Sequence, residues 1–81
     1  LNKTPVLFGD EYKDFCAGEY GQVIRKVRQT YDMTQYAFAV MIGVSMSTVG
    51  NWETQRVIPD RDHYTKLKTI ARQKGVTIND A

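Results

Sequence analysis

The chain has 81 residues, a hydrophobic share of 42% and a formal net charge of +2. This length supports one domain with a small core and leaves no room for a second domain that closes over a deep active-site cleft. The apolar share is too high for a wholly disordered chain, and no apolar run approaches the length that spans a membrane.

The cysteine content and the charge distribution indicate which cellular compartment and which kind of partner suit the chain. A single cysteine, Cys16, excludes an intramolecular disulfide and fits a reducing compartment. The first residues lack the pattern of a signal peptide, so we expect a cytoplasmic protein, and a start at Leu1 suggests a trimmed or partial chain. Residues 1–21 carry two lysines against four acidic residues, a net −2, whereas the remainder carries nine Lys/Arg against five, a net +4. A mildly basic body suits a polyanionic partner or an ordinary mixed-charge surface.

The first predicted elements are a short helical turn and an amphipathic helix. Residues 1–9 are expected to have irregular structure. Asp10 is positioned to cap a short helical turn that continues to Phe15. Over residues 19–31, apolar side chains recur at helical spacing with polar residues between them, which predicts a helix with one buried face. The apolar positions are Ile24, Val27 and Tyr31.

Two short helices follow. The hydroxyl of Thr34 can cap a helix over residues 35–42, which Gly43 ends because glycine tolerates positive φ. Ser45 or its neighbour can cap the next helix, which continues to about Thr54. The side chains predicted to face inward are Phe38, Ala39, Ile42, Val49 and Trp52.

A longer helix is predicted after the loop at residues 55–59. Asp60 is its expected cap, residues 61–73 form it, and Gly75 ends it. Residues 76–80 predict the start of a further helix. No segment alternates long enough for a strand, so the expected fold is all-α. The inward positions of the long helix are Tyr64, Leu67, Ile70 and Ala71.

The pair of short helices has the composition of a helix-turn-helix. Ala39 is small where the two helices would cross, Gly43 lies at the tight turn, and Val49 lies where the second helix packs back on the first. An ordinary αα-hairpin in a small bundle is the alternative interpretation. The shared core residues would be Phe38, Ile42, Val44 and Trp52.

Residues 24–59 resemble the phage repressor/Cro-type helix-turn-helix family, which includes xenobiotic-response-element-like regulators. The resemblance is carried by the Thr-Gln opening at 34–35, the Gly-Val-Ser turn at 43–45 and the Trp-Glu end at 52–53, and it extends over most of residues 22–76. It implies a compact four- to five-helix bundle, a lambda-repressor-like domain that binds operator DNA, often as a homodimer.

The resemblance assigns residues 21–81 to the helix-turn-helix domain and leaves residues 1–20 as an N-terminal extension of unknown role. In the family, the third helix enters the major groove and the second crosses the backbone. The implied base-contacting residues are Met46, Ser47 and Asn51. The implied backbone or flanking contacts are Thr34, Gln35, Ser45, Thr48, Thr54, Gln55 and Arg56.

The chemistry of these side chains suits the assignment. Asn51 can pair with adenine, and Met46 can contact a thymine methyl, whereas solvated helix residues would be the alternative interpretation. Gly50 is unusual inside a helix, and either permits a close approach to DNA or is simply tolerated. By the same resemblance, Arg28 and Glu53 would form a structural ion pair, with Arg28 also able to face a phosphate.

No other constellation predicts chemistry. His63 and Cys16 lie too far apart in sequence for a metal site, and Asp60 suits a helix cap better than catalysis. We therefore predict no metal site, no cofactor and no enzymatic activity. The expected function is sequence-specific binding of double-stranded operator DNA as a transcriptional regulator, with repression the favoured outcome. The alternatives are an antitoxin that also binds a toxin, with residues 1–20 as the protein-binding part, and an adaptor that uses this fold without binding DNA.

Overall fold

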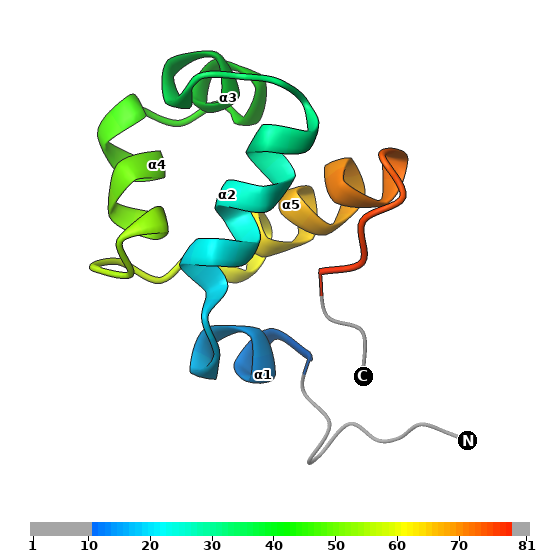
Figure 1. Cartoon of the computed structure of the whole chain (residues 1–81). Coiled ribbons are helices and arrows are strands. Elements are labelled where there is room, and N and C mark those ends of the chain that lie inside the picture. Colours follow the sequence, from blue (N-terminus) through cyan, green and yellow to red (C-terminus); the bar gives the residue numbers. More distant parts are fainter. Residues whose placement is uncertain (1–10, 79–81) are drawn as a thin grey trace.

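A computed structural model describes residues 11–78 of the chain, and Figure 1 shows their arrangement. Helix α2 runs through the middle of the view, with α3 above it, α4 to its left, α5 extending to its right and α1 below. The described residues contain no strand, which confirms the all-α prediction. The helices are α1 (Glu11–Ala17), α2 (Tyr20–Thr30), α3 (Gln35–Ile42), α4 (Met46–Glu53) and α5 (Arg61–Gln73).

The observed helices match the predicted ranges closely, with two differences. Helix α1 continues to Ala17, two residues beyond the predicted turn, and its expected cap Asp10 lies outside the described residues. The prediction of a new helix at 76–80 is wrong for residues 76–78, which are not helical, and residues 79–80 lie outside the described part. Gly75 turns the chain at φ 74°, and the Val76 amide then donates to Ala71 O, so the chain folds back onto the end of α5.

Side-chain caps begin three of the helices as predicted. Each capping oxygen accepts a hydrogen bond from an amide that has no partner within its own helix, which stabilises the first turn. The caps also fix where each loop ends, and therefore how the helices are spaced. The three bonds run from Ala37 N to Thr34 Oγ1 (3.1 Å), from Thr48 N to Ser45 Oγ (3.1 Å) and from His63 N to the Asp60 carboxylate (2.8 Å).

The helix pair α3–α4 has the expected turn and crossing. Gly43 adopts φ 92°, and both Gly43 N and Val44 N donate to Ala39 O, which closes the end of α3. Ala39 and Val49 are both fully buried, so a small side chain is present on the buried face of α3 as the crossing requires. From α5, Lys66 Nζ donates to Ile42 O at 3.1 Å and satisfies a second carbonyl at that helix end.

The core extends from the helix pair to α1. Phe15 of α1 is buried, and its ring lies 4.9 Å from that of Tyr64 on α5. The predicted domain boundary at residue 20 stays a prediction, but Phe15 lies in the same hydrophobic cluster as the rest of the domain. None of the helices within residues 11–78 has the length and apolarity required to cross a membrane. The buried apolar residues are Phe15, Tyr20, Ile24, Val27, Phe38, Ala39, Ile42, Val49, Trp52, Tyr64, Leu67 and Ala71.

Candidate nucleic-acid interface

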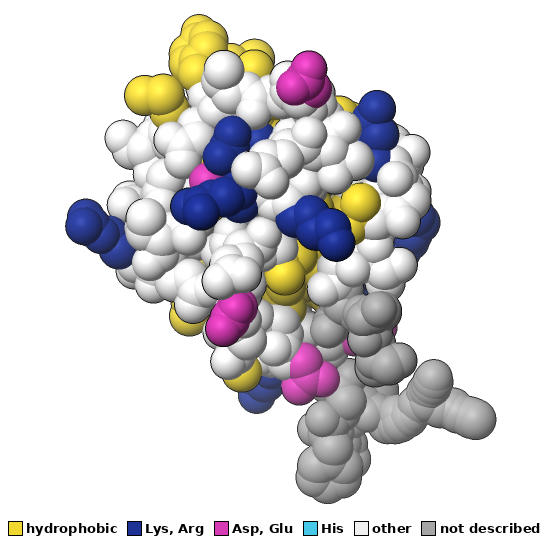
Figure 2. All heavy atoms as spheres, in the orientation of Figure 1, with side chains coloured by type: hydrophobic (Ala, Val, Ile, Leu, Met, Phe, Trp, Pro, Cys, Tyr) yellow, Lys and Arg dark blue, Asp and Glu magenta, His cyan; other side chains and the backbone are white. Residues whose placement is uncertain are grey.

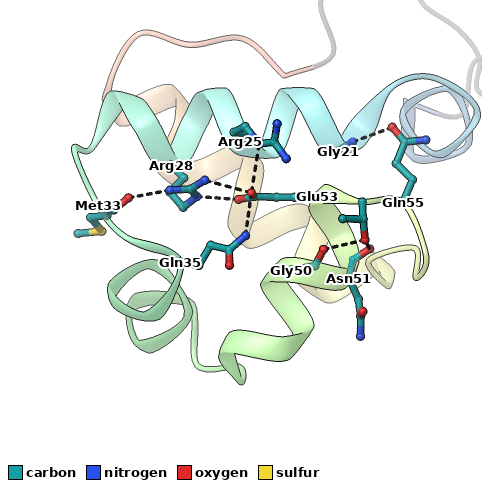
Figure 3. Close-up of polar contacts among 10 residues, drawn as sticks. Gly21, Arg25, Arg28, Met33, Gln35, Gly50, Asn51, Glu53 and Gln55 are labelled. Carbon is teal, nitrogen blue, oxygen red and sulfur yellow. Dashed lines mark hydrogen bonds and ion pairs between the residues drawn. The ribbon is translucent and has the colours of Figure 1, made fainter.

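The C-terminal end of α4 is held in place by the buried carboxylate of Glu53. Glu53, the last residue of α4, has a side chain with no exposed surface, and it accepts hydrogen bonds from Arg28 Nε at 2.7 Å and from Arg28 Nη2 at 3.1 Å. Arg28 Nη1 donates to Met33 O in the connector before α3 (Figure 3). The predicted pair therefore exists, and it ties the end of α4 to both α2 and the start of α3.

Two further donors complete the contacts of Glu53. Gln35 Nε2, from the first residue of α3, donates to Glu53 Oε1 at 3.1 Å, and Arg25 Nε donates to the same oxygen at 3.3 Å. The role of Arg25 was not predicted, although its position three residues before Arg28 places both on one face of α2. Glu53 thus connects the three helices α2, α3 and α4 through one side chain.

The pKa values of this cluster follow from its geometry. Burial of the Glu53 carboxylate acts to raise its pKa, but the hydrogen bonds from Arg28 and Gln35 outweigh that effect and hold the pKa below its ordinary value. The Glu53 hydrogen bond correspondingly raises the pKa of the Arg28 guanidinium. Both groups are therefore charged at neutral pH, and the buried negative charge is compensated.

The loop after α4 is fixed to the start of α2. Gly21 N donates to Gln55 Oε1 at 3.1 Å, so a side chain from the loop caps a helix that has no side-chain cap of its own. Gln55 adopts φ 63° to reach it. Tyr20 Oη donates to Val57 O at 3.0 Å, and Tyr12 Oη donates to Pro59 O at 2.7 Å. None of these bonds was predicted, because they join residues 34 to 47 positions apart.

The outer face of α4 carries the three predicted base-contacting residues. Met46 has 52% of its surface exposed, Ser47 is exposed and Asn51 is half-buried. Figure 3 shows the Asn51 side chain pointing away from the domain. Among the described residues, the side chains of Ser47 and Asn51 have no hydrogen-bond partner, so their polar atoms are available to a ligand. Their role at bases stays a prediction.

Most of the predicted backbone-contacting residues have structural bonds as well. Thr34 and Ser45 are the caps described above, and Ser45 Oγ and Thr48 Oγ1 lie 2.9 Å apart. Thr54 Oγ1 donates to Gly50 O at 2.9 Å and so closes the end of α4. Arg56 is exposed in the following loop, with its backbone N bonded to Asn51 O. These contacts place Thr34 at the start of α3 and the other four residues in α4 or next to its ends, and none of them tests the predicted contact with a phosphate.

Exposed hydrophobic side chains lie on the surface of α3. Figure 2 shows hydrophobic side chains gathered over α3 at the top of the view, and Lys and Arg side chains scattered over the middle of the same face. On α3, Tyr36 is 65% exposed and Val40 is 62% exposed, one turn apart on the same side of the helix. Helix α4 itself contains no lysine or arginine.

His63 packs beside Asp60 and Trp52 and belongs to no metal-binding group of side chains within the described residues. His63 Nδ1 is 2.9 Å from Asp60 Oδ1, and the imidazole packs at 5.4 Å from the Trp52 ring. Across residues 11–78 there is no group of three His, Cys, Asp or Glu side chains that could hold a metal ion. Cys16, on α1, is half-buried and unpaired.

One of three comparisons with known proteins found a match, and it agrees with this geometry. No curated protein and no solved structure matches the chain. The model of the helix-turn-helix family matches residues 24–72, which include α3, the turn at Gly43 and α4. That match covers more than half of the chain and the whole of the Glu53 cluster. The chain belongs to the Cro/C1-type helix-turn-helix family of DNA-binding transcription regulators.

Proposed function

We propose that this protein is a sequence-specific regulator that inserts α4 into the major groove of an operator and represses transcription by occupying it. The supporting observation is the division of α4 into two faces. The inner face is fixed by Val49, Trp52 and the ion pair of Glu53, whereas the outer face presents Ser47 and Asn51, whose side chains have no hydrogen-bond partner within residues 11–78. A rigid helix that exposes short uncommitted polar side chains suits base recognition in the groove.

Affinity for the phosphate backbone would come from outside α4, because that helix has no cation. Arg56, exposed in the loop that Gln55 and Tyr20 hold in place, is the residue best placed for it. A homodimer would bind two half-sites about one helical turn apart. Such a protein works by binding rather than by catalysis, and in the cytoplasm, where its DNA is found.

Selection from random duplexes tests the proposal most directly. The purified chain should enrich a sequence with two related half-sites, and its affinity should fall steeply as salt rises, with about 0.9 of log–log slope for each phosphate contact. Asn51→Ala should relax discrimination by about 1–3 kcal/mol at one base position. Failure to enrich any sequence would contradict the proposal.

Replacing the cationic side chain of Arg56 measures how much contacts with the DNA phosphates contribute to affinity. Arg56→Ala should weaken binding to all duplexes alike and reduce the salt slope by about 1. Lys74→Ala, at the far end of α5, removes the same charge away from α4 and is the matched control. Equal effects of the two substitutions would show that only net charge matters.

A second candidate function is protein binding, and one observation favours it. The exposed apolar side chains Tyr36 and Val40 on α3 form the kind of surface that partners cover. An antitoxin would use such a surface for its toxin while α4 binds DNA. The predicted role of residues 1–20 in toxin binding stays a hypothesis, and residues 1–10 lie outside the described part. If the chain binds a protein partner but enriches no DNA sequence, the result would favour an adaptor that uses this fold without binding DNA.

A further inference from the structure

The loop between α4 and α5 is held by two tyrosine hydroxyl groups. Tyr12 Oη, from α1, donates to Pro59 O at 2.7 Å. Tyr20 Oη, from the first residue of α2, donates to Val57 O at 3.0 Å. Both bonds reach backbone carbonyls of the loop, so they fix the path of the chain immediately after Arg56.

The side chains of this loop contribute little packing of their own. Val57 and Ile58 are exposed, and only Pro59 of these three residues is buried. The loop also begins at Gln55 with φ 63°, in the left-handed region that residues other than glycine rarely adopt. Because burial is small and the backbone starts in an unfavourable conformation, the loop depends on its hydrogen bonds for a single shape.

Helix α1 is a firm support for the first of these bonds. Phe15 of α1 is buried in the core, and the Tyr12 ring packs 5.5 Å from the Tyr64 ring with the Arg61 guanidinium 4.6 Å above it. Figure 1 shows α1 below the start of α2, at the end of α2 that the α4–α5 loop passes. Helix α1 precedes the residues that the family model matches, so membership of the family does not account for it.

We propose that α1 positions the loop for DNA binding: the Tyr12 hydroxyl, together with that of Tyr20, holds the backbone of residues 57–59 so that Arg56 is presented to a phosphate. Tyr12 and Tyr20 are positioning residues that act through Arg56 and do not touch the DNA themselves. Residues 11–17 thereby have a role in the affinity of the domain for its operator. This inference rests on the proposed function, because it requires Arg56 to contact the DNA backbone.

The first test removes single hydroxyl groups, because deletion of α1 would also take Phe15 out of the core. Tyr12→Phe keeps the aromatic ring and loses the bond to the loop. Its affinity for the selected operator should fall about 2- to 10-fold, which corresponds to the loss of one hydrogen-bonded contact. The salt slope should decrease towards that of Arg56→Ala, and Tyr20→Phe should behave in the same way.

Tyr31→Phe is the matched control. Tyr31 Oη donates to Ile70 O of α5, which is a bond of the same kind that does not involve the loop. Its loss should leave DNA affinity and the salt slope unchanged, and thermal midpoints measured in parallel show the stability cost of each variant. If Tyr12→Phe and Tyr31→Phe weaken DNA binding equally, the hydroxyl groups act through general stability and the proposal is overturned.

A double-mutant cycle separates positioning from a structural role. In an Arg56→Ala background, Tyr12→Phe should change affinity no further, because the side chain that it positions has been removed. An equal loss of affinity from Tyr12→Phe in both backgrounds would contradict the proposal. If the unsubstituted protein enriches no sequence, the proposed function fails together with this inference, whereas enrichment of an operator with no effect of Tyr12→Phe defeats this inference alone.

Discussion

Gly21 and Glu53 are packed so closely that no other residue fits at position 21. A Cβ on Gly21 would overlap the carbonyl oxygen of Glu53 and would also lie 2.9 Å from Cγ of Gln55. The first contact is with backbone, which cannot move aside as a flexible side chain can. This contact brings the start of α2 against the end of α4, where the Gln55 cap reaches the Gly21 amide.

Gly21→Ala should therefore destabilise the domain by about 1–3 kcal/mol, because the added methyl group forces the two backbones apart. Chemical denaturation followed by circular dichroism measures the free energy of unfolding. Gly50→Ala is the matched control, since it makes the same change inside a helix where the methyl group fits. A loss of stability in both variants would indicate that helix position, rather than packing, decides the result.

The two arginines beside Glu53 should differ in their contribution to stability. The Arg28 side chain is 16% exposed, whereas that of Arg25 is 48% exposed. Arg28→Ala leaves a buried carboxylate without its main partner and should lower the free energy of unfolding by about 3–5 kcal/mol. Arg25→Ala removes a contact that solvent screens and should cost about 0–1 kcal/mol. Equal losses in denaturation experiments would contradict this ranking.

The lowered pKa of Glu53 makes stability depend on pH in one direction. The folded-state pKa lies below the ordinary value of 4.5, so the unfolded chain takes up this proton first as pH falls. The stabilisation is complete above that value and is lost as pH decreases through the folded-state pKa. Thermal midpoints measured between about pH 7 and 3 should therefore fall less steeply for Glu53→Gln. Glu19→Gln, which removes an exposed carboxylate outside the Glu53 cluster, is the matched control.

Gln55 combines a hydrogen bond with a positive φ, and two substitutions separate these effects. Gln55→Ala loses the bond to Gly21 N while keeping φ at 63°, so it should destabilise the domain by about 0.5–2 kcal/mol. Gln55→Gly loses the same bond but relieves the left-handed backbone, and should be more stable than the alanine variant by about 1 kcal/mol. Denaturation midpoints of the two variants provide the comparison, and the opposite order would exclude backbone strain at this residue.

Local chemistry explains which predictions succeeded. The caps at Thr34, Ser45 and Asp60 form between residues three apart, so their positions follow from the order of side chains alone. The predicted helix after Gly75 did not form at residues 76–78. There the half-buried side chains of Val76 and Ile78 pack against the core, and a return of the chain onto α5 replaced a helical start.

The sequence by itself determined helices α2 to α5, the caps of α3, α4 and α5, the tight turn at Gly43 and the Arg28–Glu53 pair, because these depend on spacing within one helix or on a pattern shared by a family. Only the tertiary structure decided how Gly21 meets Glu53, which end of Gln35 faces outward, and which loop residue caps α2. Each of these depends on atoms that are 18 to 34 residues apart in the chain and meet only after the helices pack. Spacing along the chain carries no information about such contacts, whereas the donor and acceptor geometry of the folded domain does.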